Sequence, residues 1–114
     1  MKPYLHAKKC VNKWGGVEED YQPIHDWFDK SSITHGDVRH RSLLHHTFGI
    51  HLCEQVFGTN IKLSTGKLVS VRDIAEMHIM DDIGRIPSPG DYLNNMTLQD
   101  WMGGKKRKIK RIKF

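Results

Sequence analysis

Histidine and carboxylate side chains at helical spacing are the residues best suited to chemistry in this sequence. Eight of the 114 residues are His. His25 and Asp29 are four positions apart, and so are His78 and Asp82. Side chains four apart lie on the same face of a helix. Each of two segments therefore presents an imidazole beside a carboxylate, a donor pair that Zn, Mn and Fe ions accept.

These pairs predict a divalent metal site, in which a His from the middle of the chain joins the two pairs. The predicted ligands are His25, Asp29, His45, His78 and Asp82, with His6, His40 and Glu76 as second-rank candidates. His45 and His46 would point about 100° apart on a helix, so they are not expected to bind the same ion. The spacing matches neither HExxH nor a zinc finger.

Hydrolysis of a phosphate ester is the natural chemistry for such a site if the protein is an enzyme. The metal would activate water, and a nearby Glu or Asp would move protons. A metal-free alternative stays open, because a buried His and Asp can also satisfy each other. In that case His78 and Asp82 pair together or with Arg39, Arg41 or Arg72. His35 and His51 are expected at the surface.

Cationic side chains form a second group of candidates, for binding an anion or a nucleic acid. The predicted residues are Arg39, Arg41, Arg72, Lys105, Lys106, Arg107, Lys108, Lys110, Arg111 and Lys113. Seven cations in the C-terminal segment would bind a polyanion with steep salt dependence. The alternatives are a solubilising tail and arginines that pair with acids such as Asp81 and Asp82.

The charge divides the chain into two parts. The net charge is +5, yet residues 1–104 hold only 11 basic against 13 acidic side chains. We therefore expect one compact domain over residues 1–102 and a basic, flexible tail over residues 103–114. Two Cys cannot form a disulfide framework, and no apolar run suggests a signal peptide or a membrane span, so a cytoplasmic protein is expected.

Periodicity predicts a mainly α fold of about four to five helices with one β-hairpin. The expected helices begin at Pro3, at about residue 17, at residue 38 after the N-cap Asp37, at Val71 and near Asp91. The helix over residues 38–57 is expected to be the longest, central and buried. Alternating residues on either side of Ser64-Thr65-Gly66 predict the hairpin over residues 59–71. Trp101 is expected to pack back on the body. The sequence lacks GxxxxGK[ST], GxSxG and GxGxxG, which excludes a P-loop NTPase.

The chain also resembles a small His-rich family of unknown function found in phages and bacteria. The resemblance is carried by YLHA at 4–7, KWGG at 13–16, EDYQPIHDWFD at 19–29, DVRHRSLLHH at 37–46, FGI at 48–50 and VSVRDIAEMHIMDDIGRIPS at 69–88. The resemblance implies a compact intracellular domain that a phage could encode, and no particular activity. His51 and the long basic tail depart from the family pattern.

Three functional hypotheses follow. The first is a small phage-type accessory protein whose helical core holds a His/carboxylate cluster that binds metal. The second is a non-enzymatic module that binds a host protein, a nucleic acid or an anionic nucleotide. The third is a structural component of the virion, with the tail on packaged nucleic acid. The sequence does not decide between enzyme and binder.

Overall fold

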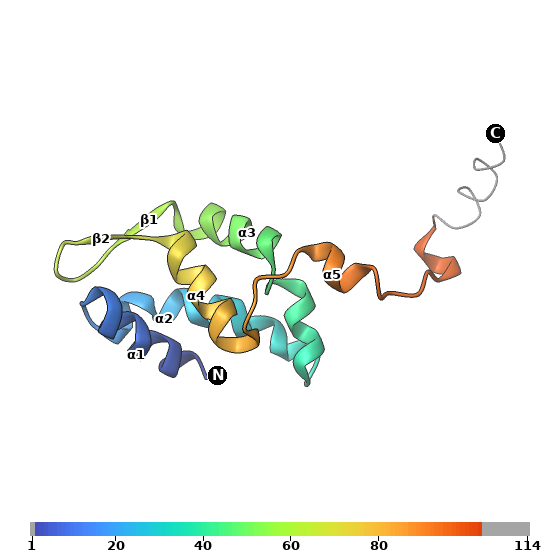
Figure 1. Ribbon diagram of the computed structural model, residues 1–114, viewed down its shortest axis with the longest axis horizontal. Helices are drawn as coiled ribbons and strands as arrows, with labels where there is room; N and C mark the ends of the chain where they lie inside the picture. Colours follow the sequence, from blue (N-terminus) through green and yellow to red (C-terminus); the bar gives the residue numbers. More distant parts are fainter. Residues whose placement is uncertain (1, 104–114) are drawn as a thin grey trace.

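The computed structural model describes residues 2–103 and is mainly helical (Figure 1). Its α-helices are α1 (Pro3–Trp14), α2 (Glu18–Asp29), α3 (Thr47–Phe57), α4 (Val71–Ile83) and α5 (Pro89–Leu93). Three 3₁₀-helices are η1 (Lys30–Ile33), η2 (Val38–Leu43) and η3 (Asp100–Met102), and the strands are β1 (Asn60–Lys62) and β2 (Leu68–Ser70). The predicted mainly α fold with one hairpin is confirmed.

Helix α4 is the central element of the packing, since it contacts α1, α2 and α3. In Figure 1 it lies between the α1–α2 pair and α3. Ser70 caps its start by accepting a hydrogen bond from the backbone N–H of Asp73. Gly84 ends it in the left-handed conformation that only glycine adopts readily. The start of α4 matches the predicted helix that begins at Val71.

Helices α1 and α2 pack against each other across a short turn at Gly15 and Gly16. Pro3 begins α1 at a position where its missing N–H costs nothing. Three acids occupy the first turn of α2, where they suit the helix dipole. The buried side chains of both helices join those of α4 in one core: Ala7, Cys10, Tyr21, Ile24, Phe28, Ile74, Ala75 and Ile79.

The Asp20 carboxylate links the hairpin loop to α2. Ile61 pairs with Val69 in the antiparallel ladder. The Asp20 carboxylate accepts hydrogen bonds from the backbone N–H and the hydroxyl of Ser64, in the hairpin loop, and from the N–H of Val17. Asp20 therefore both caps α2 and fixes the hairpin loop. The observed hairpin lies within the predicted range of residues 59–71.

The predicted helix over residues 38–57 is wrong, because the segment breaks into η2 and α3. Asp37 accepts from the N–H of Arg39, as an N-cap should, but it begins the 3₁₀-helix η2. His46 is extended, and its Nδ1 accepts a hydrogen bond 3.0 Å long from the N–H of Gly49, which starts α3 afresh. A side chain has taken the place of a helical carbonyl as acceptor. No residue of η2 is buried, so residues 38–43 of the expected central helix lie at the surface.

The C-terminal part of the described chain also differs from the prediction. Asp91 lies inside α5 rather than at its cap, and accepts from the N–H of Ser88. The helix ends at Leu93. Trp101 was expected to pack on the body but is 82% exposed. Figure 1 shows α5 and the following residues leading away from the long helices. Across residues 2–103, no helix has the length and apolar character needed to cross a bilayer.

Candidate metal centre

Four donor side chains from three parts of the chain meet in the core. Asp29 ends α2, His45 lies in the break between η2 and α3, and His78 and Asp82 share one face of α4. One ligand atom from each lies within 4.8 Å of every other. Both imidazoles are fully buried, Asp82 is 1% exposed and Asp29 is 21% exposed. The break in the predicted helix is what brings His45 to this point.

The spacing of the donor atoms fits a metal coordination shell. His45 Nε2 lies 2.9 Å from Asp82 Oδ2 and 3.6 Å from Asp29 Oδ1. His78 Nε2 lies 3.2 Å from Asp82 Oδ2 and 3.4 Å from Asp29 Oδ1. Zinc bonds of about 2.0–2.1 Å place tetrahedral ligands about 3.3–3.4 Å apart. The four separations in the structure therefore lie on either side of the ligand–ligand distance expected for a tetrahedral zinc site.

His78 supplies the strongest sign that hydrogen bonding alone does not satisfy the cluster. Its Nε2 is buried and makes no hydrogen bond, although two carboxylates lie nearby. Its other nitrogen, Nδ1, lies 2.9 Å from Nδ1 of His25. A buried polar atom without a partner is costly and requires an explanation. An ion bound at Nε2 would supply one.

His25 and His6 both lie around His78, and His6 Nε2 also lies 3.1 Å from Asp82 Oδ1. His25 Nε2 is 3.2 Å from Cys10 Sγ, so both its nitrogens already have partners. The ring of His6 stacks on that of His78, with centroids 3.9 Å apart. His6, His25 and His78 form a second possible ligand group. Their rings are within 27° of parallel, which does not point three in-plane lone pairs at one ion.

Protonation favours ligand binding at the four-residue group. Burial lowers the pKa of His25 to about 3 and lowers that of His45, so both rings are neutral near pH 7. Burial alone would raise the pKa of Asp82, but the hydrogen bonds from His45 and His6, together with the nearby ring of His78, hold it well below its usual range. For His78, burial acts downward, but Asp29 and Asp82 outweigh it and the pKa rises. A cation would replace that proton on His78.

The structure places the remaining predicted ligands elsewhere. His40 Nδ1 lies 3.1 Å from the Ser31 hydroxyl, with its ring edge-on to that of His45. Glu76 lies on another face of α4, beside Lys13 and Met80. His35 and His51 are exposed as expected.

Within residues 2–103, the three arginines of the predicted cationic group are not brought together. Arg39 is ion-paired with Asp37, and Arg72 lies 3.6 Å from Glu54. Arg41 is the one of these three described arginines that reaches the cluster, with Nη2 4.0 Å from Asp82 Oδ1. Arg72 lies in the first turn of α4 and Asp82 in its last turn, about 15 Å apart along the helix, so Arg41 and Arg72 do not share a small anion. The seven basic residues from Lys105 to Lys113 lie outside the described residues.

Sequence reasoning missed Cys10, Asp81 and Tyr92 as neighbours of the cluster. Asp81 lies 3.4 Å from His6 and accepts from Lys9. The Tyr92 hydroxyl donates to the backbone carbonyl of His45. The Asp81-Asp82 doublet was a signal for the first, since adjacent acids on a buried helix need partners. Contacts of Cys10 and Tyr92 depend on the tertiary packing and left no signal in the spacing.

Comparison with known proteins agrees with the resemblance seen in the sequence only at the level of the family. No curated protein and no solved structure matches the chain. A family model described as a domain of unknown function, DUF6915, matches residues 1–102, which is most of the chain. The protein with this buried cluster of histidines and carboxylates therefore belongs to the DUF6915 family.

Proposed function

We propose that Asp29, His45, His78 and Asp82 bind one divalent cation and that the protein acts through it. The observation that carries the proposal is the buried Nε2 of His78, which has no hydrogen bond and lies within 3.4 Å of both carboxylates. Two imidazoles and two carboxylates suit Zn, Mn or Fe. The two negative charges of the carboxylates would offset the charge of the ion in the protein interior.

A hydrogen-bond network is the competing explanation, and it accounts for only part of the geometry. His45 Nε2 and Asp82 Oδ2 lie 2.9 Å apart, as in an ordinary hydrogen bond. His78 Nε2 makes no such bond, and Asp29 adds a second carboxylate beside the first. A cation at the centre accounts for both features at once.

We further propose that the centre hydrolyses a phosphate ester. Asp29 is the most exposed member of the group, so solvent reaches the cluster from that side. A bound cation would supply an activated water and would polarise a phosphoryl oxygen. Arg41, beside Asp82, would add positive charge near the transferred group. Mn or Fe, which take six ligands, would leave positions for water and substrate.

Elemental mass spectrometry of untagged protein tests the metal centre. We expect one equivalent of Zn, Mn or Fe per chain in the wild type, lost in His78→Ala and in the gentler His78→Gln. His51→Ala, which removes an exposed His, should keep the metal. Circular dichroism would show which variants fold. Folded wild-type protein that takes up none of these ions after incubation would refute the proposal.

The last part of the proposal concerns the biological role of the protein. We place the protein as a cytoplasmic accessory protein of phage type, on the resemblance noted in the sequence. The rival hypotheses, a binding module and a virion component, depend on the basic tail. Deleting residues 105–114 should leave the metal content unchanged and would weaken binding to DNA if the tail contacts nucleic acid.

A further inference from the structure

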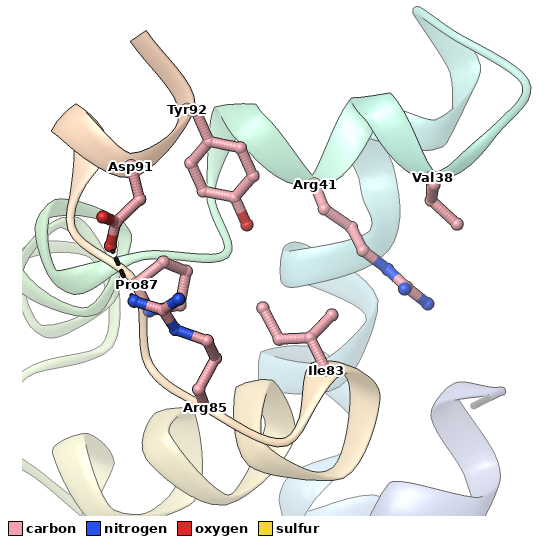
Figure 2. Close-up of a pocket in the computed structure, with 7 residues that line it drawn as sticks. All are labelled: Val38, Arg41, Ile83, Arg85, Pro87, Asp91 and Tyr92. Carbon is pink, nitrogen blue, oxygen red and sulfur yellow. Dashed lines mark hydrogen bonds and ion pairs between the residues drawn. The ribbon is translucent and has the colours of Figure 1, made fainter. Parts of the chain in front are cut away.

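A cavity of about 310 Å³ lies next to the candidate metal centre (Figure 2). We call it the Arg41 pocket, and its walls are Val38, Arg41, Ile83, Arg85, Pro87, Asp91 and Tyr92. Figure 2 shows Tyr92 pointing from α5 into the pocket and Ile83 facing it from the end of α4. Arg41 and Arg85 lie on opposite sides. The volume is at the lower end of the range for small-molecule sites.

Three walls of the pocket connect directly to proposed metal ligands. Arg41 Nη2 lies 4.0 Å from Asp82 Oδ1. Ile83 follows Asp82 in the chain, and the Tyr92 hydroxyl donates a 2.9 Å hydrogen bond to the carbonyl of His45. A ligand in the pocket would therefore reach toward the centre across the side chain of Arg41.

Arg41 is the group in the pocket best placed to bind an anion. Its side chain is 21% exposed, and its Nε is buried without a hydrogen-bond partner. The Asp82 carboxylate, 4.0 Å from Arg41, is already contacted by His45 and by His6. Arg85 is 68% exposed and pairs with Asp91 at 3.2 Å, so Asp91 would partly oppose an anion on that side. The guanidinium of Arg41 can bind a phosphate through two parallel N–H groups.

The remaining walls of the pocket determine which group can bind next to the anion. Val38, Ile83, Pro87 and the ring of Tyr92 give the cavity mainly apolar sides. An aromatic group would bury its surface there and stack on Tyr92. The pocket therefore combines the guanidinium of Arg41 with a small, mainly apolar lining.

We propose that the Arg41 pocket binds a small phosphate monoester with an aromatic group, such as a nucleoside monophosphate. This proposal rests on the proposed function, because it names the substrate class of the same centre. The phosphate contacts Arg41 at the side nearer the cluster, and the aromatic group lies against Tyr92. Such a pose presents the ester to the proposed cation.

Calorimetric titration with adenosine 5′-monophosphate tests the pocket separately from the metal. We expect Arg41→Gln to weaken binding about tenfold or more, since a charged hydrogen bond is lost. Tyr92→Leu should weaken binding of the nucleotide more than that of inorganic phosphate. The control is Arg72→Gln, an exposed arginine at the other end of α4, which should leave binding within about twofold.

The outcomes distinguish failure of the pocket from failure of the metal centre. Metal content is measured on the same samples, and Arg41→Gln should keep the wild-type amount. Nucleotide binding unchanged in metal-replete Arg41→Gln, or no binding of nucleotide or phosphate to the metal-replete wild type, would overturn the pocket proposal. Wild-type protein without metal that still binds nucleotide through Arg41 would support the pocket and refute only the metal centre.

Discussion

The imidazoles of His25 and His78 meet inside the core with their Nδ1 atoms 2.9 Å apart. Such a contact needs one donor and one acceptor, so a single proton is shared between the two nitrogens. If Nε2 of His78 binds an ion, Nδ1 of His78 must carry the proton and donate it to His25. His25 then carries its own proton on Nε2, toward Cys10 Sγ at 3.2 Å. One hydrogen bond thus fixes the tautomer of the proposed ligand.

Removing this hydrogen bond should weaken metal binding without removing a ligand of the four-residue group. For His25→Leu we expect affinity to fall about 10- to 100-fold, the usual effect of losing the partner that orients a metal-binding His. Competition with a chromophoric chelator would measure the change, and His51→Leu is the matched control. Equal affinities for the two variants would mean that His25 does not orient His78.

Chelation should lower the thermal stability of the metal-loaded protein. An ion present at about 100 times its Kd adds about 2.7 kcal/mol, which is about 10 °C or more in Tm for a domain of this size. Differential scanning calorimetry with and without EDTA would measure it. Because His78→Gln lacks a ligand, EDTA should leave its Tm unchanged. A wild-type Tm that does not respond, in a sample shown to hold metal, would contradict a linkage between the ion and folding.

The break between η2 and α3 depends on the absence of a side chain at residue 49. A Cβ on Gly49 would overlap the backbone carbonyl of Leu44. We therefore expect Gly49→Ala to destabilise the fold by about 1–3 kcal/mol, the cost of overpacking, and to displace His45. Gly36→Ala is the control, since a Cβ there meets nothing within 4 Å. Urea unfolding of both variants measures the difference, and similar losses would argue against this packing.

The thiol of Cys53 should make the protein less stable in alkali. Burial, aided by the Glu54 carboxylate, raises its pKa from 9.0 to about 12. The folded pKa lies above the unfolded one, so the stabilisation is complete below pH 9 and is lost as pH rises toward 12. One proton corresponds to at most about 1.4 kcal/mol per pH unit. Between pH 9 and 11 the free energy of unfolding should therefore fall more steeply for the wild type than for Cys53→Ala, and parallel slopes would contradict this.

Local signals in the sequence were sufficient for the starts of α1, α2 and α4 and for the hairpin. Pro3 and the acids after Gly16 act within a few residues of themselves, so they mark element boundaries wherever the chain goes. The prediction of one helix over residues 38–57 was wrong because a local signal within the segment was not recognised. Their apolar pattern is helical, but His46 supplies an acceptor to Gly49 and stops the helix, and a His N-cap is not part of the usual pattern.

The candidate site was predicted in composition but not in arrangement. Spacing of four residues placed His78 and Asp82 on one face of α4, and the structure agrees. The position of His25 behind His78, rather than beside Asp29 in the four-atom group, depends on how α2 packs on α4. Helical periodicity gives the face of each helix and not the angle between two of them. Arg41 and Tyr92 became neighbours of the cluster only through that packing.

The large separation in sequence between α2 and α4 has a consequence for the folding kinetics. His25 and His78 are 53 positions apart, and closing a loop of that length costs entropy during folding. Ile24 and Phe28 on one helix and Ile74 and Ile79 on the other belong to the same apolar core, so the core closes this loop without an ion. A cation that binds after the core has formed stabilises only the finished state. Its main effect should be a slower unfolding rate, with the folding rate almost unchanged.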